Sequence, residues 1–499
     1  MNEEKSISWD SLHCIALALD SYKVRALIDA REDILKTKIY SEKQYEDLLF
    51  SIFDLERLKY ALFKFLERNS ENSLETIMIF AKSINIPLRV AFKLFELLKI
   101  ENLITIEKNE FNLENDVSSA IEISLKNYKI HVFKGDISKI KSIYQPVKII
   151  FESNICSGCG LCSAICPLNC LSVINGNGSI EDEKCIRCGL CYFVCPRSFL
   201  PISLLNMVQS ETNSFKITYE LLGYYKEIYS ARSKIPEIRE KCQDGGITST
   251  CLYYLLDKKL IDKAIGARIS NDPWKPEPHI INTKEDILLT AGTKYVNNAN
   301  LSAFKINNVN EGKIAVVGVP CQMQALLKSE IYDINFPMLK NIEYRIGIFC
   351  MESFSYESFL KICEILKAPL NEIRKTDINK GKFFIYLNDG TELSIPIKEI
   401  THLARKDCKV CYDLTSESAD ISIGSIGSPS GWNTVIIRTS KGMELFQNLI
   451  KNNLIEVKNI SEIKPGLPLL EKITNSKKTK CKKHINEKKS KKEKIPSYY

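Results

Sequence analysis

Residues 156–167 read CSGCGLCSAICP and residues 185–196 read CIRCGLCYFVCP. Both stretches have the spacing Cys-x2-Cys-x2-Cys-x3-Cys-Pro, the ligand pattern of a bacterial-type ferredoxin module with two [4Fe–4S] clusters. The fourth cysteine of each run ligates the other cluster. We therefore expect two crossed sets, the first of Cys156, Cys159, Cys162 and Cys195, and the second of Cys185, Cys188, Cys191 and Cys166. Structural zinc sites, which usually show separated Cys-x2-Cys pairs, and a disulfide framework are weaker alternatives.

The composition is that of an ordinary globular protein of several domains. The chain has 499 residues, 44% of them hydrophobic and 26% charged, which allows about three domains. No apolar run approaches the ~20 residues of a membrane span, and the start of the chain lacks the basic and apolar regions of a signal peptide. Eighteen cysteines in such a chain indicate a reducing cytoplasm, where thiolates hold metal.

The net charge of +8 is concentrated at the carboxyl end. Residues 472–499 contain 11 lysines and two glutamates, a formal balance of +9 that leaves about −1 for the rest of the chain. A lysine-rich segment buries little apolar surface, so residues 471–499 are predicted to be a disordered, solubilising tail.

Residues 1–145 are predicted to form a mostly helical domain. Apolar residues recur at helical spacing over 47–68. Residues 73–84 and 88–99 read as two helices separated by a turn, and 103–113 as a strand, turn and strand, an order that resembles a winged-helix domain. DNA binding needs clustered basic residues, whereas the charges over 73–113 balance to zero. A docking or structural role is therefore favoured over nucleic-acid binding.

The ferredoxin module should occupy 146–200, and an α/β domain about 215–470. In the latter, β-branched runs alternate with helical stretches. Strands are expected at 313–319, 344–350, 383–387 and 433–439. The predicted fold class is thus multidomain α+β, with a helical domain, a ferredoxin module and a carboxyl-terminal α/β domain.

Four further cysteines follow elements of this α/β domain. Cys321 and Cys350 come at the ends of two strands, and Cys408 and Cys411 form a Cys-x2-Cys pair. Ligands gather at strand ends in open α/β sheets, so the four could converge on a third [4Fe–4S] cluster. From spacing alone, ordinary buried thiols or a dithiol redox pair at Cys408 and Cys411 remain open.

The sequence around these cysteines resembles a known family. The segments are 231–252, 290–301, 312–326, 346–359 and 407–439, the last reading DCKVCYDLTSESADISIGSIGSPSGWNTVIIRT. In order and spacing they look like the β subunits of coenzyme F420-reducing hydrogenases and F420-linked dehydrogenases, in which a preceding ferredoxin module is a common fusion. The resemblance covers about 230–440 and leaves the first 145 residues and the tail outside it.

This resemblance implies non-covalent FAD, a cluster in the flavin domain and hydride exchange with the deazaflavin coenzyme F420. The ligands of the third cluster would be Cys321, Cys350, Cys408 and Cys411. Flavin contacts would come from Gln243, Asp244, Gly245, Gly246 and Thr248, and then from Thr293, Lys294 and Tyr295. Lys294 would bind a phosphate or carboxylate, and Tyr295 would stack. Without the family, residues 243–248 read as a plain Gly-Gly turn with a helix cap.

One position departs from the family pattern. The family usually has an acidic residue after the glycine of the block that begins at Ala419, whereas this chain has Ser425, which puts a detail of the site in doubt. The sequence contains no G-x-G-x-x-G motif, so a Rossmann-type nucleotide site is not indicated. The other cysteines lack partner spacing and are expected to be inert: Cys14, Cys170, Cys242, Cys251, Cys363 and Cys481.

The sequence therefore predicts an oxidoreductase that passes single electrons between a flavin and a partner protein through three clusters. No catalytic acid–base pair is expected, because a flavin converts hydride into single electrons by itself. The alternatives are a ferredoxin-dependent reductase of another organic substrate, a DNA-binding redox sensor, and an electron-relay protein without flavin.

Overall fold

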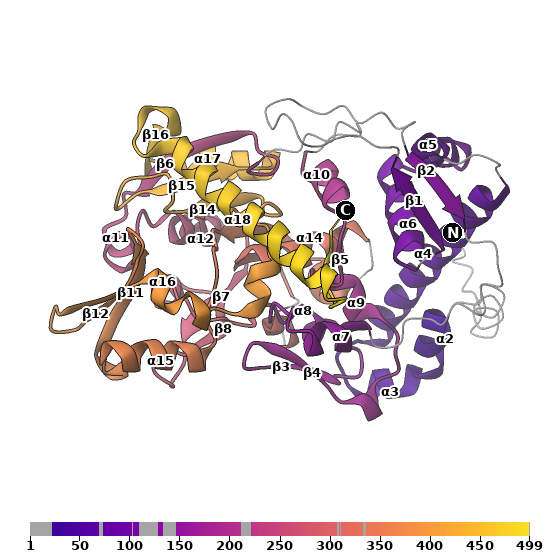
Figure 1. The fold of residues 1–499 in the computed structure, drawn as a ribbon, viewed down its shortest axis with the longest axis horizontal. Helices are drawn as coiled ribbons and strands as arrows, with labels where there is room; N and C mark the ends of the chain where they lie inside the picture. Colours follow the sequence, from indigo (N-terminus) through magenta and orange to yellow (C-terminus); the bar gives the residue numbers. More distant parts are fainter. Residues whose placement is uncertain are drawn as a thin grey trace.

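The computed structural model describes residues 22–68, 73–101, 103–108, 128–132, 146–210, 221–306, 309, 311–332 and 336–498. Figure 1 shows a helical amino-terminal unit, a small cysteine-rich module beside it, and a larger unit built on an extended sheet. Within the described ranges, none of the helices combines the length and the apolar character needed to span a bilayer.

The amino-terminal unit is formed by α2 (Tyr22–Asp29), α3 (Arg31–Lys36), α4 (Glu42–Arg68), α5 (Leu74–Ser83), α6 (Leu88–Ile100), β1 (Ile104–Lys108) and β2 (Tyr128–Val132). The long helix α4 buries Leu48, Ile52 and Leu55 on one face, which gives this unit its core. The hydroxyl of Ser73 accepts a hydrogen bond from the amide of Glu75 and begins α5.

Most of the expected elements of this unit are confirmed. The predicted helix over 47–68 begins earlier, at Glu42, and those over 73–84 and 88–99 are α5 and α6. The strand pairing differs, because β1 pairs antiparallel with β2, which lies well beyond 103–113. Residues 109–113 lie outside the described residues, and the winged-helix assignment and the docking role remain predictions.

The cysteine-rich module contains α7 (Pro146–Glu152), α8 (Leu161–Ile165), β3 (Leu171–Ile174), β4 (Asn177–Ile180), α9 (Leu190–Val194), β5 (Phe199–Leu200) and α10 (Ile202–Gln209). Gly160 begins α8 with φ of 90°, and a Cβ there would lie 2.7 Å from the amide nitrogen of Ser302 in the large unit. Glycine is required because the two units approach so closely.

The amino-terminal unit contacts the module through specific side chains. The hydroxyl of Tyr40 donates to the carbonyl of Ile165 at 2.8 Å, and that of Thr37 donates to the carbonyl of Pro167 at 2.9 Å. The ammonium of Lys23 lies 4.6 Å from the centre of the Phe193 ring in α9. The helical unit therefore covers the loops that carry the fourth cysteine of the first run.

The large unit contains an eight-stranded mixed sheet, ordered β16-β6-β15-β14-β10-β9-β7-β8 in the described part of the chain. The strands are β6 (Glu227–Ser233), β7 (Lys263–Ile269), β8 (Pro276–Ile281), β9 (Ile314–Gly318), β10 (Ile342–Ile348), β14 (Ile421–Gly424), β15 (Asn433–Ile437) and β16 (Ile455–Asn459). Strands β7, β9, β10 and β14 are parallel neighbours, and antiparallel strands flank them on both sides. Strand β9 is apolar and buried along its whole length, as expected for a strand covered on both faces, whereas β7 and β10 also carry charged residues.

Helices and a smaller sheet surround this sheet. The helices are α11 (Pro236–Lys241), α12 (Ile247–Asp257), α13 (Lys284–Thr290), α14 (Pro320–Ile331), α15 (Tyr356–Leu366), α16 (Ile397–Ile400) and α17 (Ser440–Lys451). The predicted strands at 313–319, 344–350 and 433–439 are confirmed as β9, β10 and β15. The run at 383–387 is also a strand, but it is the centre of a separate antiparallel sheet of β11 (Ile373–Asn379), β12 (Lys382–Leu387) and β13 (Glu392–Pro396).

The prediction of a disordered tail over 471–499 is wrong. Residues Gly466–Ser490 form helix α18, which crosses from the large sheet toward the cysteine-rich module in Figure 1. One face of α18 is buried at Leu470, Thr474, Lys477 and Cys481, while most of the other lysines remain exposed. After the helix, β17 (Ser497–Tyr498) pairs in parallel with β5. The prediction from composition was wrong because a few buried side chains are enough to anchor a helix whose lysines mostly point to solvent.

Candidate functional site

The cysteines of the two ferredoxin runs form two crossed groups. Cys195 is an electrostatic neighbour of Cys156 and Cys159, its partners from the other run. Likewise, Cys166 is an electrostatic neighbour of Cys185 and Cys188. The two short helices α8 and α9 lie side by side, so the cysteine after each helix points into the opposite loop. This is the arrangement that two cubane clusters need.

The thiols of these groups are chemically suited to metal. Burial raises the pKa of Cys156 to about 12 and that of Cys159 to about 11. A thiolate in such a place is unstable unless a cation neutralises it, and iron supplies that charge. Among the described residues, no three His, Cys, Asp or Glu side chains lie close enough together to hold a single metal ion. The donor set fits cubane clusters, which spread four thiolates over four irons.

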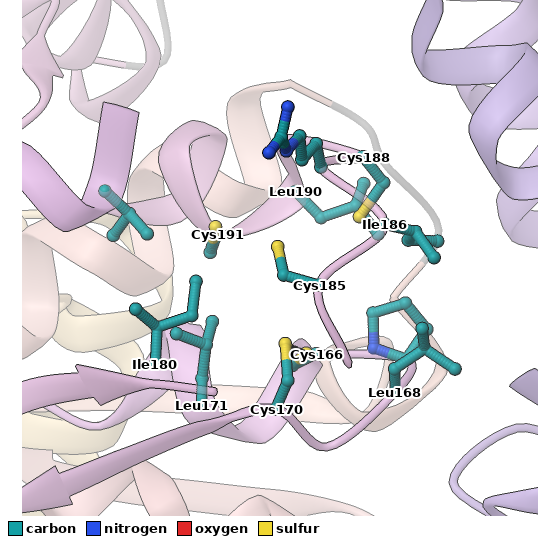
Figure 2. Close-up of a pocket in the computed structure, with 14 residues that line it drawn as sticks. Cys166, Leu168, Cys170, Leu171, Ile180, Cys185, Ile186, Cys188, Leu190 and Cys191 are labelled. Carbon is teal, nitrogen blue, oxygen red and sulfur yellow. Dashed lines mark hydrogen bonds between the residues drawn. The ribbon is translucent and has the colours of Figure 1, made fainter. Parts of the chain in front are cut away.

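The second group contains a fifth thiol. Figure 2 shows Cys170 beside Cys166 in the cavity that Cys185, Cys188 and Cys191 also line. The two sulfur atoms of Cys166 and Cys170 are 3.4 Å apart. Hydrogen bonding with Cys170 lowers the pKa of Cys166 to about 7 and that of Cys185 to about 6. Cys170 was expected to be an inert cysteine, and its contact with Cys166 shows that it belongs to this site.

A third group of cysteines forms at the carboxyl edge of the large sheet. Cys321 follows β9 in the first turn of α14, and Cys350 follows the neighbouring parallel strand β10, so both reach the same edge. Cys408 and Cys411 lie on and after a short 3₁₀ helix, Lys406–Val410. Cys321 is an electrostatic neighbour of Cys350 and Cys411, and Cys408 of Cys350. The four predicted ligands of the third cluster are therefore brought together.

Two buried cations lie at this third group, and sequence reasoning missed both. Lys477 of α18 donates to the carbonyl of Cys350 at 2.5 Å, and Cys411, Cys350 and Cys408 raise its pKa despite burial. Arg197, which is 1% exposed, interacts electrostatically with Cys411 and Cys321 and donates to the hydroxyl of Tyr498. These positive charges would offset the negative charge of a thiolate-bound cluster at this group. Single buried lysines and arginines carry no spacing signal, so no motif could have found them.

The three groups are arranged in series. Cys321 of the third group is an electrostatic neighbour of Cys159 in the first. Cys162 of the first group is in turn a neighbour of Cys191 in the second. Arg405 ties the units together, because its guanidinium donates to the carbonyls of Cys156 and Gly176 at 2.8 Å. The large unit and the module are thus in direct contact, and neighbouring cysteine groups are close enough to interact electrostatically.

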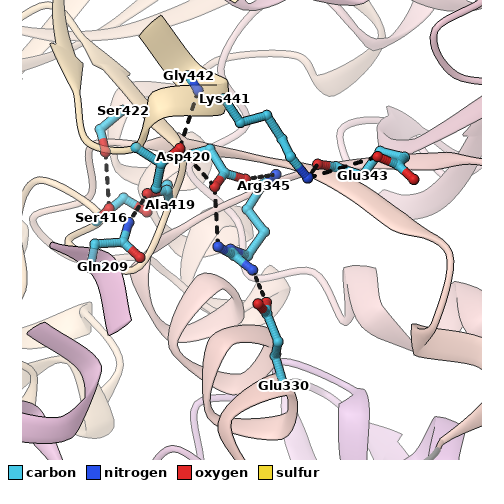
Figure 3. Close-up of polar contacts among 11 residues, drawn as sticks. Gln209, Glu330, Glu343, Arg345, Ser416, Ala419, Asp420, Ser422, Lys441 and Gly442 are labelled. Carbon is cyan, nitrogen blue, oxygen red and sulfur yellow. Dashed lines mark hydrogen bonds and ion pairs between the residues drawn. The ribbon is translucent and has the colours of Figure 1, made fainter. Parts of the chain in front are cut away.

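A buried ion pair holds the segment that follows Cys411. Figure 3 shows Asp420 between β10 and the start of α17. Its carboxylate accepts hydrogen bonds from the amide of Arg345 at 2.7 Å, from the Arg345 guanidinium at 3.1 Å and from the hydroxyl of Thr439 at 3.1 Å. In the same view, Gln209 of the module donates to the carbonyl of Ala419. The network fixes the segment that runs from Cys411 to β14 (Ile421–Gly424).

The predicted flavin loop lies at the start of α12. Gly246 begins the helix with φ of 75°, and a Cβ on Gly245 would lie 2.6 Å from the amide nitrogen of Asn433. These glycines are therefore required by packing against β15 and β6, as in the plain Gly-Gly turn. Thr248 is half-buried in the first turn of the helix. Gln243 bonds through its side-chain carbonyl to the amide of Thr293 at 3.3 Å, which brings the two predicted loops together.

Charged residues from the small sheet complete this polar loop. Gln243 donates to the Asp377 carboxylate at 2.8 Å, and the ammonium of Lys375 donates to the Gln243 carbonyl at 3.0 Å. Burial and Asp377 raise the pKa of Asp244, and a hydrogen bond from Ser425 opposes them. Ser425, the departure from the family pattern, thus places a neutral donor beside Asp244 where an acidic residue would repel it.

The two other candidate residues make structural contacts. The Lys294 ammonium donates to the carbonyls of Thr290 and Ala291 at the end of α13, and burial lowers its pKa to about 8. Tyr295 accepts from the amide of Ile378 and packs edge-on against Phe383. Its hydroxyl is also an electrostatic neighbour of Asp244 and Cys350. Tyr295 therefore interacts electrostatically with both the polar loop and the third cysteine group.

The polar loop is chemically suited to a flavin nucleotide. It offers the Lys375 ammonium to anionic or carbonyl oxygens, and Asp244 and Gln243 to ring N–H groups, while the first amide of α12, that of Ile247, already donates to the Asn433 side chain. These residues would hold FAD in this protein.

Comparisons with known proteins bear on these sites. Residues 228–305 and 311–463 match the models of the amino- and carboxyl-terminal parts of the coenzyme F420 hydrogenase/dehydrogenase beta subunit, and residues 148–196 match a 4Fe-4S dicluster domain. The beta subunit of coenzyme F420 hydrogenase from Methanothermobacter thermautotrophicus is 40% identical over 53% of this chain and 95% of that protein. One of the subunits of the F(420)H(2) dehydrogenase of Methanosarcina mazei is 35% identical over 68% of this chain and 95% of that protein.

A solved structure agrees with these matches. A chain of the F420-reducing nickel–iron hydrogenase complex from Methanosarcina barkeri is 39% identical, with a TM-score of 0.53 over 54% of this chain and 94% of that chain. Together with the dicluster module, these matches define the class as an iron–sulfur oxidoreductase subunit. The chain belongs to the family of coenzyme F420 hydrogenase/dehydrogenase beta subunits.

Proposed function

We propose that this protein exchanges hydride with coenzyme F420 at a bound FAD and passes the electrons singly through three [4Fe–4S] clusters to or from a partner protein. The observation that carries the proposal is the series of three cysteine groups that begins beside the polar loop. When bound, FAD converts a two-electron hydride into single electrons, which is the chemistry that links a deazaflavin to iron–sulfur clusters.

The residues of the chain have distinct parts in this function. The loop of Gln243 and Asp244, braced by Lys375 and Asp377, would position the flavin. Tyr295 would separate the flavin from the third cluster, which Cys321, Cys350, Cys408 and Cys411 would hold. Lys477 and Arg197 would stabilise the added negative charge when that cluster is reduced. The module would then carry electrons away from the flavin domain or toward it.

A partner protein is part of the proposal. The solved relative is a chain of a hydrogenase complex. This chain has 39–40% identity to such relatives over about half its length, and the dicluster module and helical unit add to it. We expect the partner to accept or supply electrons at the second cluster, which is the end of the series.

Cofactor analysis and redox titration test the proposal. Protein purified without oxygen should contain about 12 iron atoms and one FAD per chain. Reduced F420 should bleach the flavin absorbance and then that of the clusters. Protein without flavin would overturn the proposal in favour of an electron relay. Reduction by reduced ferredoxin, with no response to F420, would instead support the ferredoxin-dependent reductase.

A further inference from the structure

The second cluster site has one thiol more than a cubane requires. Among the described cysteines, Cys166, Cys185, Cys188, Cys191 and Cys170 line one cavity. Figure 2 shows the sulfur atoms of Cys166 and Cys170 next to each other at the floor of this cavity. Four irons bind four thiolates, so one thiol of the pair is left over whenever the other is bound.

The position of Cys170 is fixed by a tight turn. The amide of Asn169 donates to the carbonyl of Cys166 at 3.1 Å, and Asn169 itself has φ of 52°, which turns the chain back on itself. The carbonyl of Cys170 accepts from the amide of Glu181 at 2.9 Å, at the base of the β3–β4 hairpin. Cys170 is 4% exposed, so its thiol is held in the cavity rather than in solvent.

Neighbouring units brace the same turn. The ammonium of Lys305 donates to the Asn169 side chain at 2.5 Å and to the carbonyl of Leu171 at 3.0 Å. On the other side, Thr37 donates to the carbonyl of Pro167. With both ends anchored, the turn keeps Cys166 and Cys170 at the same side of the cavity.

Among the described residues, the first cluster site shows no sulfur pair like that of Cys166 and Cys170. Cys195 occupies the place that corresponds to Cys166, and the residue four positions later is Phe199. Phe199 is 1% exposed and packs against Tyr332 with ring centres 5.6 Å apart. Within the described part of the chain, a second thiol beside the fourth ligand is therefore a feature of the second site, and the first site provides an internal control.

We propose that Cys166 and Cys170 are interchangeable ligands of the same iron in the second cluster. In the exchange, the bond from iron to the Cys166 sulfur breaks and a bond from iron to the Cys170 sulfur forms. The proton of the Cys170 thiol passes to the released Cys166 thiolate along the 3.4 Å contact, so no electron is gained or lost. The site would thus keep its fourth iron when either thiolate leaves it.

Alanine variants of the full chain test this proposal. Protein purified without oxygen would be examined for iron and sulfide content and by electron paramagnetic resonance of each reduced cluster. Cys166→Ala and Cys170→Ala should each keep two four-iron clusters in the module, whereas the double variant should lose the fourth iron of the second cluster. Cys195→Ala should lose the fourth iron of the first cluster as a single change, because Phe199 cannot replace the ligand.

The outcomes separate the proposal from a passive role of Cys170. A three-iron second cluster in Cys166→Ala would overturn the exchange, as would a complete four-iron cluster in the double variant. Loss of iron in Cys170→Ala would also overturn it, because Cys170 would then be an indispensable ligand. An intact first-cluster signal in the Cys166 and Cys170 variants verifies folding. The readout depends on the dicluster module and not on the reaction with F420, so the two proposals fail separately.

Discussion

We expect the ionised carboxylate of Glu101 to be an important electrostatic contribution to the stability of the amino-terminal unit. Its carboxylate bridges Lys23 at 2.8 Å and Lys59 at 2.7 Å, and so ties α2 and α4 to the end of α6. Burial opposes ionisation of Glu101, but the two ammonium groups outweigh it and lower its pKa from 4.5 to about 2. We expect Glu101→Gln to loosen this unit at neutral pH.

The magnitude follows from the lowered pKa. The gap between 4.5 and about 2 corresponds to ~3 kcal/mol, at 1.36 kcal/mol for each pKa unit. Because the folded pKa is below the unfolded one, this stability is complete above about pH 4.5 and is lost as the pH falls toward 2. At pH 7 the variant should therefore open the unit about a hundredfold more often.

A matched control lies on the same helix. Burial raises the pKa of Glu96, although Lys99 is 3.5 Å away. Its charge is a cost to the fold, so Glu96→Gln should change the free energy of opening by less than about 1 kcal/mol.

Hydrogen exchange of peptides from α4 and α6, measured by mass spectrometry at pH 7, reports this opening directly. Equal protection in Glu101→Gln and in the unchanged protein would refute the reasoning, as would a larger loss in Glu96→Gln. Because Lys23 also lies over Phe193 in α9, oxygen should attack the second cluster faster in Glu101→Gln.

Three further predictions concern the path of electrons. Cys350→Ser should still let reduced F420 bleach the flavin in rapid mixing, while reduction of the ferredoxin-type clusters slows by orders of magnitude; unchanged rates and iron content would mean that Cys350 is an ordinary thiol. Removal of residues 472–499 should lower the iron content by about four atoms per chain, because Lys477 and Tyr498 contact the third site and the module. The control is Lys489→Glu, a change at an exposed lysine of the same segment. Full iron content after truncation would contradict the structure. Cys195→Ala should block reduction of the second cluster by reduced F420 but not that of the third, which separate spectroscopic signals can follow; a second cluster reduced at the normal rate would place the first cluster off the path.

Sequence alone was sufficient where the chemistry is local. A cubane needs thiolates at short, fixed intervals, so the runs at 156–167 and 185–196 indicate the module without any knowledge of its surroundings. Strands such as 313–319 and 433–439 were also predictable, because buried strands are continuous apolar runs. The place of Cys321 and Cys350 at one sheet edge followed from the rule that parallel strands end together.

Tertiary structure decided the contacts between residues far apart in the chain. Composition predicted a disordered tail, yet Lys477 reaches Cys350 from the inward face of α18, and Tyr498 reaches Val410 from β17, which pairs with β5. Cys170 appeared to be an isolated cysteine; it lies only four residues after Cys166, and the distant Lys305 braces the turn at Asn169 that holds the two sulfur atoms together. Residue spacing predicts the ligands and elements that one short segment can form by itself. The partner of a single buried side chain depends instead on how distant segments pack, and that information is spread over the whole chain.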